Sequence, residues 1–171
     1  TPSKIDSKET EHLRQIGPDL IFSFYYRAMI PKEVLDIPEL GAYNIHGALL
    51  PKYRGRACVN WAVINGEKET GATLHVMTEF ADRGEIIAQK SVPINFEDTA
   101  HDVFLKVTEA SREILLSSLP SLENGTAKRY PQDESKATKF GRRRPEDGDI
   151  DWKRSADEIY NIVRALTHPF P

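Results

Sequence analysis

The longest periodic pattern in the chain runs from Thr99 to about Leu119 and limits the fold more than any other feature. Its apolar residues recur at intervals of three and four, which is typical of a helix with one buried stripe. Pro120 follows and is expected to end this helix. The residues of the stripe are Ala100, Val103, Phe104, Val107, Ala110 and Ile114.

Shorter patterns of two kinds precede this helix. Apolar or alternating runs predict strands, and three- to four-residue spacing predicts short helices. Strands alternating with helices are typical of an α/β sheet with parallel components, in which ligands bind at the carboxyl ends of strands. The expected strands are 18–26, 41–46, 70–77 and 85–94, and the expected short helices are 31–40 and 56–66.

Residues 125–150 differ in character from the rest of the chain. They are polar, charged and rich in Pro and Gly, as expected of a linker that crosses a surface. A further helix is predicted after them, because Ser155 and Glu158 have the spacing of a capping box. Its expected buried stripe consists of Ile159, Ile162, Val163 and Leu166.

The composition excludes several classes of function. One cysteine, Cys58, rules out an internal disulfide and a multi-thiolate metal site, so we expect a reducing, cytoplasmic setting. The net charge of −3 gives no reason to expect tight non-specific binding to nucleic acid. No apolar run is long enough to span a bilayer, and the first residues lack the apolar centre of a signal peptide.

Two polar residues interrupt the expected strand 41–46, where a buried strand should be apolar. Asn44 and His46 are two residues apart, so they project to the same face at the strand's carboxyl end. An amide can stabilise a developing oxyanion and an imidazole can move a proton near neutral pH, which suits acyl transfer. An ordinary polar pair at a strand end explains the spacing equally well.

Asp82 is a third candidate, in the segment ADRGEII (81–87). A carboxylate in a loop between two strands could orient the imidazole of His46 and favour its charged form. Asp-x-Gly is also common turn chemistry, and spacing alone favours that simpler interpretation.

Three segments together resemble the family of formyltransferases that use 10-formyltetrahydrofolate: NIHGALLPKYRGR, TGATLHVM and ADRGEIIAQ. The family signature is Asn-x-His followed by Ser-Leu-Leu-Pro and, later, Asp-x-Gly. The similarity covers nearly the whole chain in the right order, with Ala48 in place of the family Ser. The segments FSFYYR, LLPKYRGRACVNWAVINGEKETGATLH and FGRRRPEDG are most similar to the branch that formylates UDP-4-amino-4-deoxy-L-arabinose.

The resemblance implies a role for each candidate residue. His46 would be the general acid/base, Asn44 the oxyanion stabiliser and Asp82 the carboxylate that supports His46. The implied co-substrate is 10-formyltetrahydrofolate, with no metal. The implied cofactor-binding residues are Ala28, Met29, Ile30, Arg56, Thr78, Glu79, Phe80, Ala81 and Asp82.

The resemblance also implies a fold and a domain order. We expect a Rossmann-like formyltransferase sheet with flanking helices, truncated at both ends, and the first helix of a small C-terminal β-barrel-like domain. The expected divisions are a catalytic domain at 1–130, a linker at 131–150 and the start of the C-terminal domain at 151–171.

The function implied is formyl transfer to the 4-amino group of a UDP-linked amino sugar, in lipid A modification and resistance to cationic antimicrobial peptides. The implied partners are that sugar nucleotide and, through a fused dehydrogenase-like domain outside this sequence, further copies of the protein. Methionyl-tRNA formylation and an inactive folate-binding fragment are the alternatives.

Four further features are interpreted as structural. His75 shares a strand face with Thr73 and Met77 and is expected to be a packed or bridging residue. Trp61 and Trp152 are expected in the core, and Arg142–Arg144 on a solvated linker.

Overall fold

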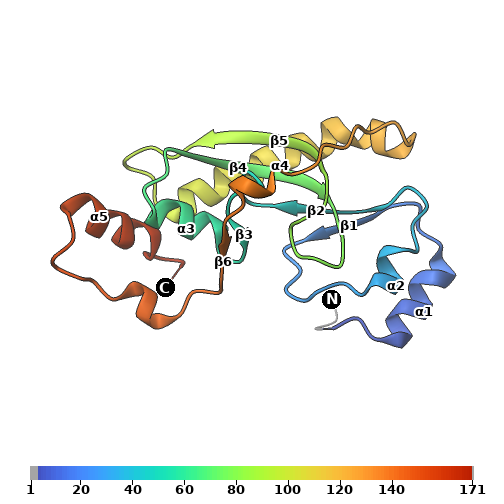
Figure 1. Ribbon diagram of the computed structural model, residues 1–171, viewed down its shortest axis with the longest axis horizontal. Helices are drawn as coiled ribbons and strands as arrows, with labels where there is room; N and C mark the ends of the chain where they lie inside the picture. Colours follow the sequence, from blue (N-terminus) through green and yellow to red (C-terminus); the bar gives the residue numbers. More distant parts are fainter. Residues whose placement is uncertain (1–3, 171) are drawn as a thin grey trace.

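A four-stranded sheet forms the middle of the computed structural model, which describes residues 4–170 (Figure 1). The strand order is β1-β2-β4-β5; β1 and β2 are parallel, and the other neighbouring pairs are antiparallel. This arrangement confirms the predicted α/β class with a parallel component. The strands are β1 (Ile21–Phe24), β2 (Ala42–His46), β4 (Glu69–Val76) and β5 (Ile86–Pro93).

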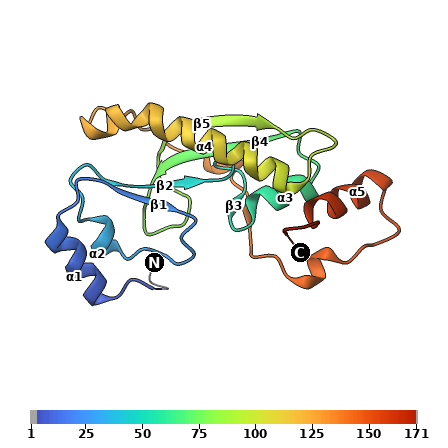
Figure 2. The ribbon, with the colours of Figure 1, turned by 180° about the vertical axis from the view of Figure 1, so that it is seen from behind.

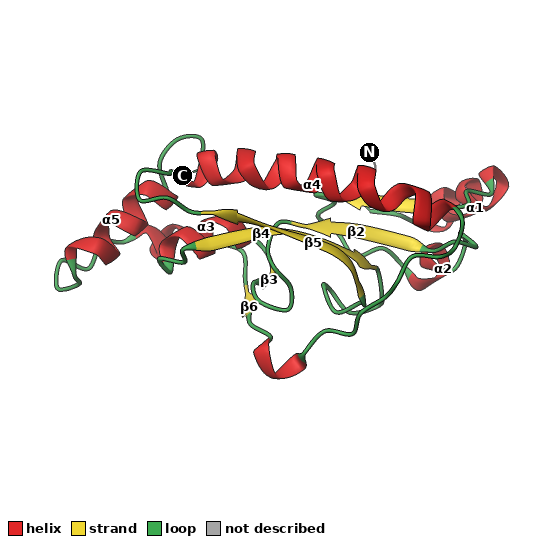
Figure 3. Ribbon diagram, turned by 90° about the horizontal axis from the view of Figure 1, so that it is seen from above, coloured by secondary structure: helices red, strands yellow, loops and turns green. Residues whose placement is uncertain are grey.

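One long helix, α4 (Ala100–Glu123), lies across one face of the sheet (Figure 3). It packs on β4 and β5, and the predicted stripe faces the core: Val103 and Val107 are fully buried. The helix begins at Thr99, whose side chain accepts a hydrogen bond from the Asp102 amide while the Asp102 carboxylate accepts from the Thr99 amide.

The expectation that Pro120 ends this helix is wrong, because α4 continues past it to Glu123. Proline removes the backbone hydrogen bond to the residue four positions earlier, Leu116. Leu116 is exposed, so water can satisfy its carbonyl group there. Beyond the proline, Leu122 is buried at 1% exposure and extends the apolar stripe. Packing therefore outweighs the loss of one hydrogen bond.

The remaining α-helices lie in pairs at the two ends of the molecule (Figure 2). Helix α1 was not anticipated, although its signals stand in the sequence: Asp6 and Glu9 form a capping box, and Gly17 caps the other end with a left-handed backbone. The pairs are α1 (Ser7–Ile16) with α2 (Lys32–Leu35), and α3 (Cys58–Ile64) with α5 (Ala156–Ala165).

Helix α5 begins at Ser155 with the predicted capping box to Glu158. Its buried face differs from the prediction, because Val163 is 50% exposed and Arg164 is buried. The Arg164 guanidinium donates hydrogen bonds to the carbonyl oxygens of Asn95, at 2.8 Å, and of Asp98, at 2.9 Å. These contacts turn the arginine inward and leave Val163 on the outside.

The segment predicted as a linker is attached to the sheet region at several points. Tyr130 forms an antiparallel bridge with Ile86. Farther along, β6 pairs in parallel with β3, and Phe140 stacks on Tyr53 and Trp61. Trp61 is thus packed as expected, whereas Trp152 is 79% exposed and not in the core. The short elements here are β3 (Arg54–Gly55), η1 (Glu134–Lys136), β6 (Lys139–Phe140) and η2 (Pro145–Gly148).

Gly71 on β4 lies where no larger residue fits. A Cβ atom there would overlap the backbone oxygen of Lys90 and the side chain of Leu49. We expect Gly71→Ala to lower the free energy of unfolding by about 2–3 kcal/mol, as overpacking does in a rigid core. Gly141→Ala is the control: a Cβ there has nothing within 4 Å, so we expect a change below about 0.5 kcal/mol. Equal urea midpoints for the two variants would contradict this account.

In the described part of the chain, no helix has both the length and the apolar character needed to cross a membrane.

Candidate active site

Asn44 and His46 lie at the carboxyl end of β2, on one face of the strand, as predicted. The alternate residues Tyr43 and Ile45 point to the other face and belong to the hydrophobic core. Across the antiparallel pair, His75 on β4 is the register partner of Asn44, and Thr73 is the partner of His46. The sheet thus gathers these polar side chains on one surface.

The His46 ring is buried, at 7% exposure. Its Nε2 atom lies 2.8 Å from the backbone oxygen of Tyr53. A carbonyl oxygen can only accept, so Nε2 carries a hydrogen and donates it there. The other ring nitrogen, Nδ1, faces Asp82 with 3.6 Å to Oδ1, beyond a good hydrogen bond. Nδ1 is therefore the ring atom that can take up or release a proton.

Asp82 lies in the loop between β4 and β5, and its side chain is 12% exposed. Its Oδ2 atom accepts a hydrogen bond of 2.8 Å from the Gly55 amide, which fixes the carboxylate. Its Oδ1 atom lies 3.6 Å from His46 Nδ1 and 3.7 Å from His75 Nε2. The loop therefore places one carboxylate beside two imidazoles.

His75 belongs to this cluster, and the sequence interpretation missed it. Burial at 2% exposure lowers the pKa of its imidazole from the ordinary 6.5 to about 4, only partly opposed by the hydrogen bond to the Val76 carbonyl and by the charge of Asp82. The neutral ring donates from Nδ1 to the Val76 carbonyl at 2.9 Å, so Nε2 accepts. Nε2 lies 3.2 Å from Asn44 Nδ2, and the amide must therefore turn its NH₂ group towards His75.

This geometry has a consequence for Asn44. Its NH₂ group has two hydrogens, of which one is donated to His75, so the second can serve an oxyanion. The bridging role expected for His75 is consistent with this contact. The signal that could have placed His75 in the site is the strand pattern of residues 70–77, but only with the cross-strand register known.

The lowered pKa of His75 predicts a pH dependence of stability. Above about pH 6.5 the imidazole is neutral in both the folded and the unfolded chain. Between pH 6.5 and about 4 the unfolded chain binds a proton that the folded chain does not. The free energy of unfolding therefore falls as the pH is lowered through this range. We expect His75→Gln to reduce the loss of stability between pH 7 and pH 4.5 by about 2 kcal/mol. Urea titrations of both proteins at the two pH values measure the free energy of unfolding. An equal loss in the parent and in the His75 variant would contradict the lowered pKa of His75.

Beside Asp82 a hollow of about 580 Å³ opens on the surface. Four of the predicted cofactor-binding residues line it: Met29, Glu79, Phe80 and Ala81. Arg83 and Lys139 lie on the same hollow, and the Arg83 guanidinium lies 5.9 Å from the centre of the exposed Phe80 ring. Aromatic and apolar surface next to cations suits a flat, anionic ligand such as a folate.

The other predicted cofactor-binding residues lie near this hollow in the fold without lining it. The exposed Arg56 donates a hydrogen bond of 2.9 Å to the Arg27 carbonyl. This contact joins the loop of Arg56 to the segment that contains Ala28 and Ile30, which directly follows Arg27. Thr78 Oγ1 exchanges hydrogen bonds with the backbone of Phe80 and so shapes the 78–82 loop.

Ala48 is completely buried and forms part of the hydrophobic core. Its carbonyl oxygen accepts a hydrogen bond of 2.6 Å from Thr73 Oγ1. Within residues 4–170, no group of three or more His, Cys, Asp or Glu side chains is arranged to hold a metal ion.

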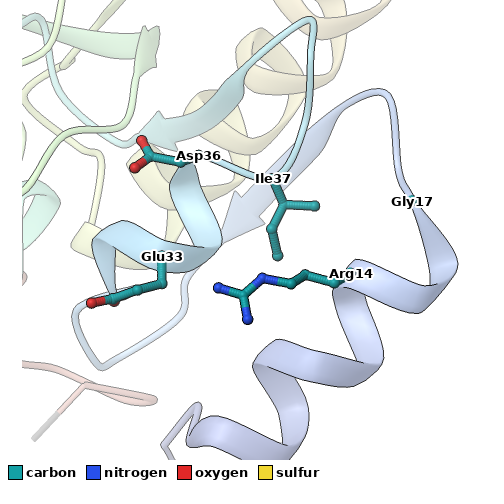
Figure 4. Close-up of a pocket in the computed structure, with 5 residues that line it drawn as sticks. All are labelled: Arg14, Gly17, Glu33, Asp36 and Ile37. Atoms are coloured by element: carbon teal, nitrogen blue, oxygen red, sulfur yellow. The ribbon is translucent and has the colours of Figure 1, made fainter.

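A second hollow, of about 450 Å³, lies between α1 and α2 and contains none of the candidate residues. Arg14 reaches from α1 towards Glu33 and Ile37 (Figure 4). This hollow is open, and its one arginine and two carboxylates are exposed to solvent, so nothing in it suggests catalysis.

Two family models match this chain. Residues 1–119 match the model of the formyl transferase family, and residues 142–171 match the model of the formyl transferase C-terminal domain. Because the first match covers more than half of the sequence, the chain belongs to the formyl transferase family.

Solved structures of several proteins, two of them formyltransferases, have the same fold. An N-formyltransferase from Helicobacter canadensis, in complex with folinic acid and dTDP-3-aminofucose, is 28% identical with a TM-score of 0.81, over 95% of this chain and 59% of that one. A 4-N formyltransferase from Francisella tularensis is also 28% identical, with a TM-score of 0.82, over 96% and 68%. HypX from Aquifex aeolicus, in complex with tetrahydrofolic acid, is 25% identical with a TM-score of 0.82, over 97% and 29%. The chain thus spans 59% of the length of the Helicobacter protein.

Proposed function

We propose that the protein transfers a formyl group from 10-formyltetrahydrofolate to the amino group of a nucleotide-linked amino sugar. The observation that carries this proposal is the meeting of the Asn44 amide, the His46 imidazole and the Asp82 carboxylate at the end of β2. The hollow beside them, lined by Met29 and Phe80, supports a folate as the donor. The ligands of the Helicobacter relative, folinic acid and dTDP-3-aminofucose, support both substrate classes.

In the mechanism that we propose, the neutral sugar amine attacks the formyl carbon and a C–N bond forms. The carbonyl oxygen becomes an oxyanion, which accepts a hydrogen bond from the second N–H of Asn44. His46 takes the proton that the new ammonium centre loses, at Nδ1, and delivers it to the departing folate nitrogen as the old C–N bond breaks. Asp82 stabilises the imidazolium form between these two transfers.

The particular acceptor that we propose is UDP-4-amino-4-deoxy-L-arabinose, formylated at its 4-amino group. Support comes from the segments FSFYYR and LLPKYRGRACVNW, which resemble the branch of the family that uses this sugar. The formylated sugar would serve lipid A modification and antimicrobial peptide resistance, in the cytoplasm. The net charge of −3 counts against charged tRNA as the acceptor.

The test supplies the purified protein with 10-formyltetrahydrofolate and one acceptor at a time. The acceptors are UDP-4-amino-4-deoxy-L-arabinose, dTDP-3-aminofucose and methionyl-tRNA, and mass spectrometry detects the added formyl group. We expect the UDP sugar to have the highest kcat/KM. Transfer to dTDP-3-aminofucose alone would overturn the choice of sugar, and transfer to tRNA alone would overturn the proposed function.

A further inference from the structure

The backbone of Asp82 is in a conformation that needs external support. Its φ angle of 58° is in the left-handed region, which a residue other than glycine adopts at a cost of about 1–3 kcal/mol. Two residues on, Gly84 is pressed against β4, since a Cβ there would overlap the Val76 carbonyl. The loop that presents the carboxylate is therefore strained and closely fitted, and something must hold it in place.

A single side chain from the segment after α4 holds both sides of this turn. The Gln132 amide donates from Nε2 to the Asp82 carbonyl at 2.9 Å and to the Gly84 carbonyl at 2.7 Å. A glutamine NH₂ group has two hydrogens, and both are used here. The bridge between Tyr130 and Ile86 places the glutamine, because Tyr130 is two residues before it.

Arg54 fixes the orientation of this amide. Its Nε and Nη2 atoms donate to Gln132 Oε1 at 3.2 and 2.7 Å, and a guanidinium cannot accept. The glutamine oxygen must therefore face Arg54 and its NH₂ group must face the loop. Nη1 and Nη2 donate to the two carboxylate oxygens of Glu134, which lowers the pKa of that carboxyl group. Arg54 is buried at 4% exposure, whereas the side chain of Glu134 is 59% exposed, so the arginine is the member of the pair that packs inside the protein.

We propose that Gln132 is a positioning residue for the reaction: it holds the strained turn so that the Asp82 carboxylate stays between Gly55, His46 and His75. This inference rests on the proposed function. It gives the segment that was predicted to be a linker a part in building the active site, 50 residues from the carboxylate in sequence.

The informative variant is Gln132→Glu. The carboxylate keeps the size of the side chain and its acceptor for Arg54, but it has no hydrogen for the Asp82 and Gly84 carbonyls. We expect kcat for formyl transfer to fall about 10- to 100-fold, as small misplacements of catalytic groups do, with the KM for the amino sugar changed less than about twofold.

Gln89→Glu is the matched control. Like Gln132, Gln89 donates from its amide to a carbonyl, that of Leu50 at 2.8 Å, and it also donates to Thr73; its side chain is more exposed than that of Gln132, and neither hydrogen bond is to the Asp82 loop. We expect this variant also to lose hydrogen bonds, and some stability with them, while keeping its kcat within about threefold of the parent. A loss of kcat in Q89E equal to that in Q132E would overturn the positioning role.

A second measurement does not depend on activity. The Gly55 amide donates to Asp82 Oδ2, so its hydrogen exchange reports whether the carboxylate stays in place. We expect exchange at Gly55 to be at least about tenfold faster in Q132E and unchanged in Q89E. If the parent protein transfers no formyl group, the proposed function fails, and the Gly55 exchange still decides the role of Gln132.

Unchanged Gly55 exchange and unchanged kcat in a folded Q132E protein would overturn the proposal. If Q132E does not fold, Gln132→Met is measured in the same way, because it has similar length, no added charge and no donor. If the Gly55 amide exchanged as slowly in that variant as in the parent, this result would equally count against the role that we propose for Gln132.

Discussion

Replacing His46 with Ala is expected to lower kcat for formyl transfer by about 10²- to 10⁴-fold, the usual worth of a positioned general acid/base. The reason is the arrangement of the ring: Nε2 is held by the Tyr53 carbonyl, and Nδ1 is the atom beside Asp82 that can carry the proton. Binding of folinic acid should change little, because the His46 ring does not line the hollow proposed for the folate. Steady-state kinetics and calorimetric titration with folinic acid measure the two effects.

The matched control for this variant is His12→Ala on the exposed face of α1, which removes the same side chain at a distance from the sheet site. We expect kcat and folate affinity to stay at the level of the parent. Turnover by the His46 variant at more than about a tenth of the parent rate would show that another group carries the proton.

Replacing Asn44 with Ala should lower kcat by about 10²- to 10³-fold, the effect of removing one preorganised oxyanion donor. The amide orientation set by the neutral His75 ring leaves one N–H for the substrate, and alanine removes it. Because this hydrogen bond strengthens as charge develops, KM for both substrates should change much less than kcat. Initial rates over a range of each substrate concentration provide both constants.

Asn60→Ala is the control, because it also removes an asparagine side chain with little exposure: Asn44 is half-buried and Asn60 is buried. Asn60 donates to the Ala165 carbonyl at 2.8 Å between α3 and α5, so its loss should cost stability, about 1–3 kcal/mol, and leave kcat unchanged. If Asn44→Ala raised KM and left kcat intact, the amide would be a binding contact and not an oxyanion donor.

Much of the fold follows from local sequence pattern. The spacing of apolar residues predicted the strands and α4, because burial on one face imposes a period of two or of three to four residues. The continuation of α4 past Pro120 and the exposure of Val163 could not be predicted in this way. In α4 the burial of Leu122 compensates for the proline, and in α5 the contacts of Arg164 with distant carbonyls decide which face turns inward.

The candidate site was only partly visible in the sequence. Asn44 and His46 share a face by strand geometry alone, whereas Asp82 could be selected only through the family resemblance. His75 enters the site because antiparallel pairing places it opposite Asn44, and register is a property of two strands. Gln132 acts across 50 residues through hydrogen bonds to backbone oxygens, for which local sequence has no signature.

The most direct test of the account follows a formyl label from donor to acceptor. The protein is mixed in a single turnover with 10-formyltetrahydrofolate labelled at the formyl carbon and with UDP-4-amino-4-deoxy-L-arabinose, and carbon NMR identifies the labelled product. We expect the label to appear as a formamide on the sugar's 4-nitrogen in the parent protein and to remain on the folate in the His46 and Asn44 variants. Label that remains on the folate with the parent, or equal transfer by all three proteins, would contradict formyl transfer at this site.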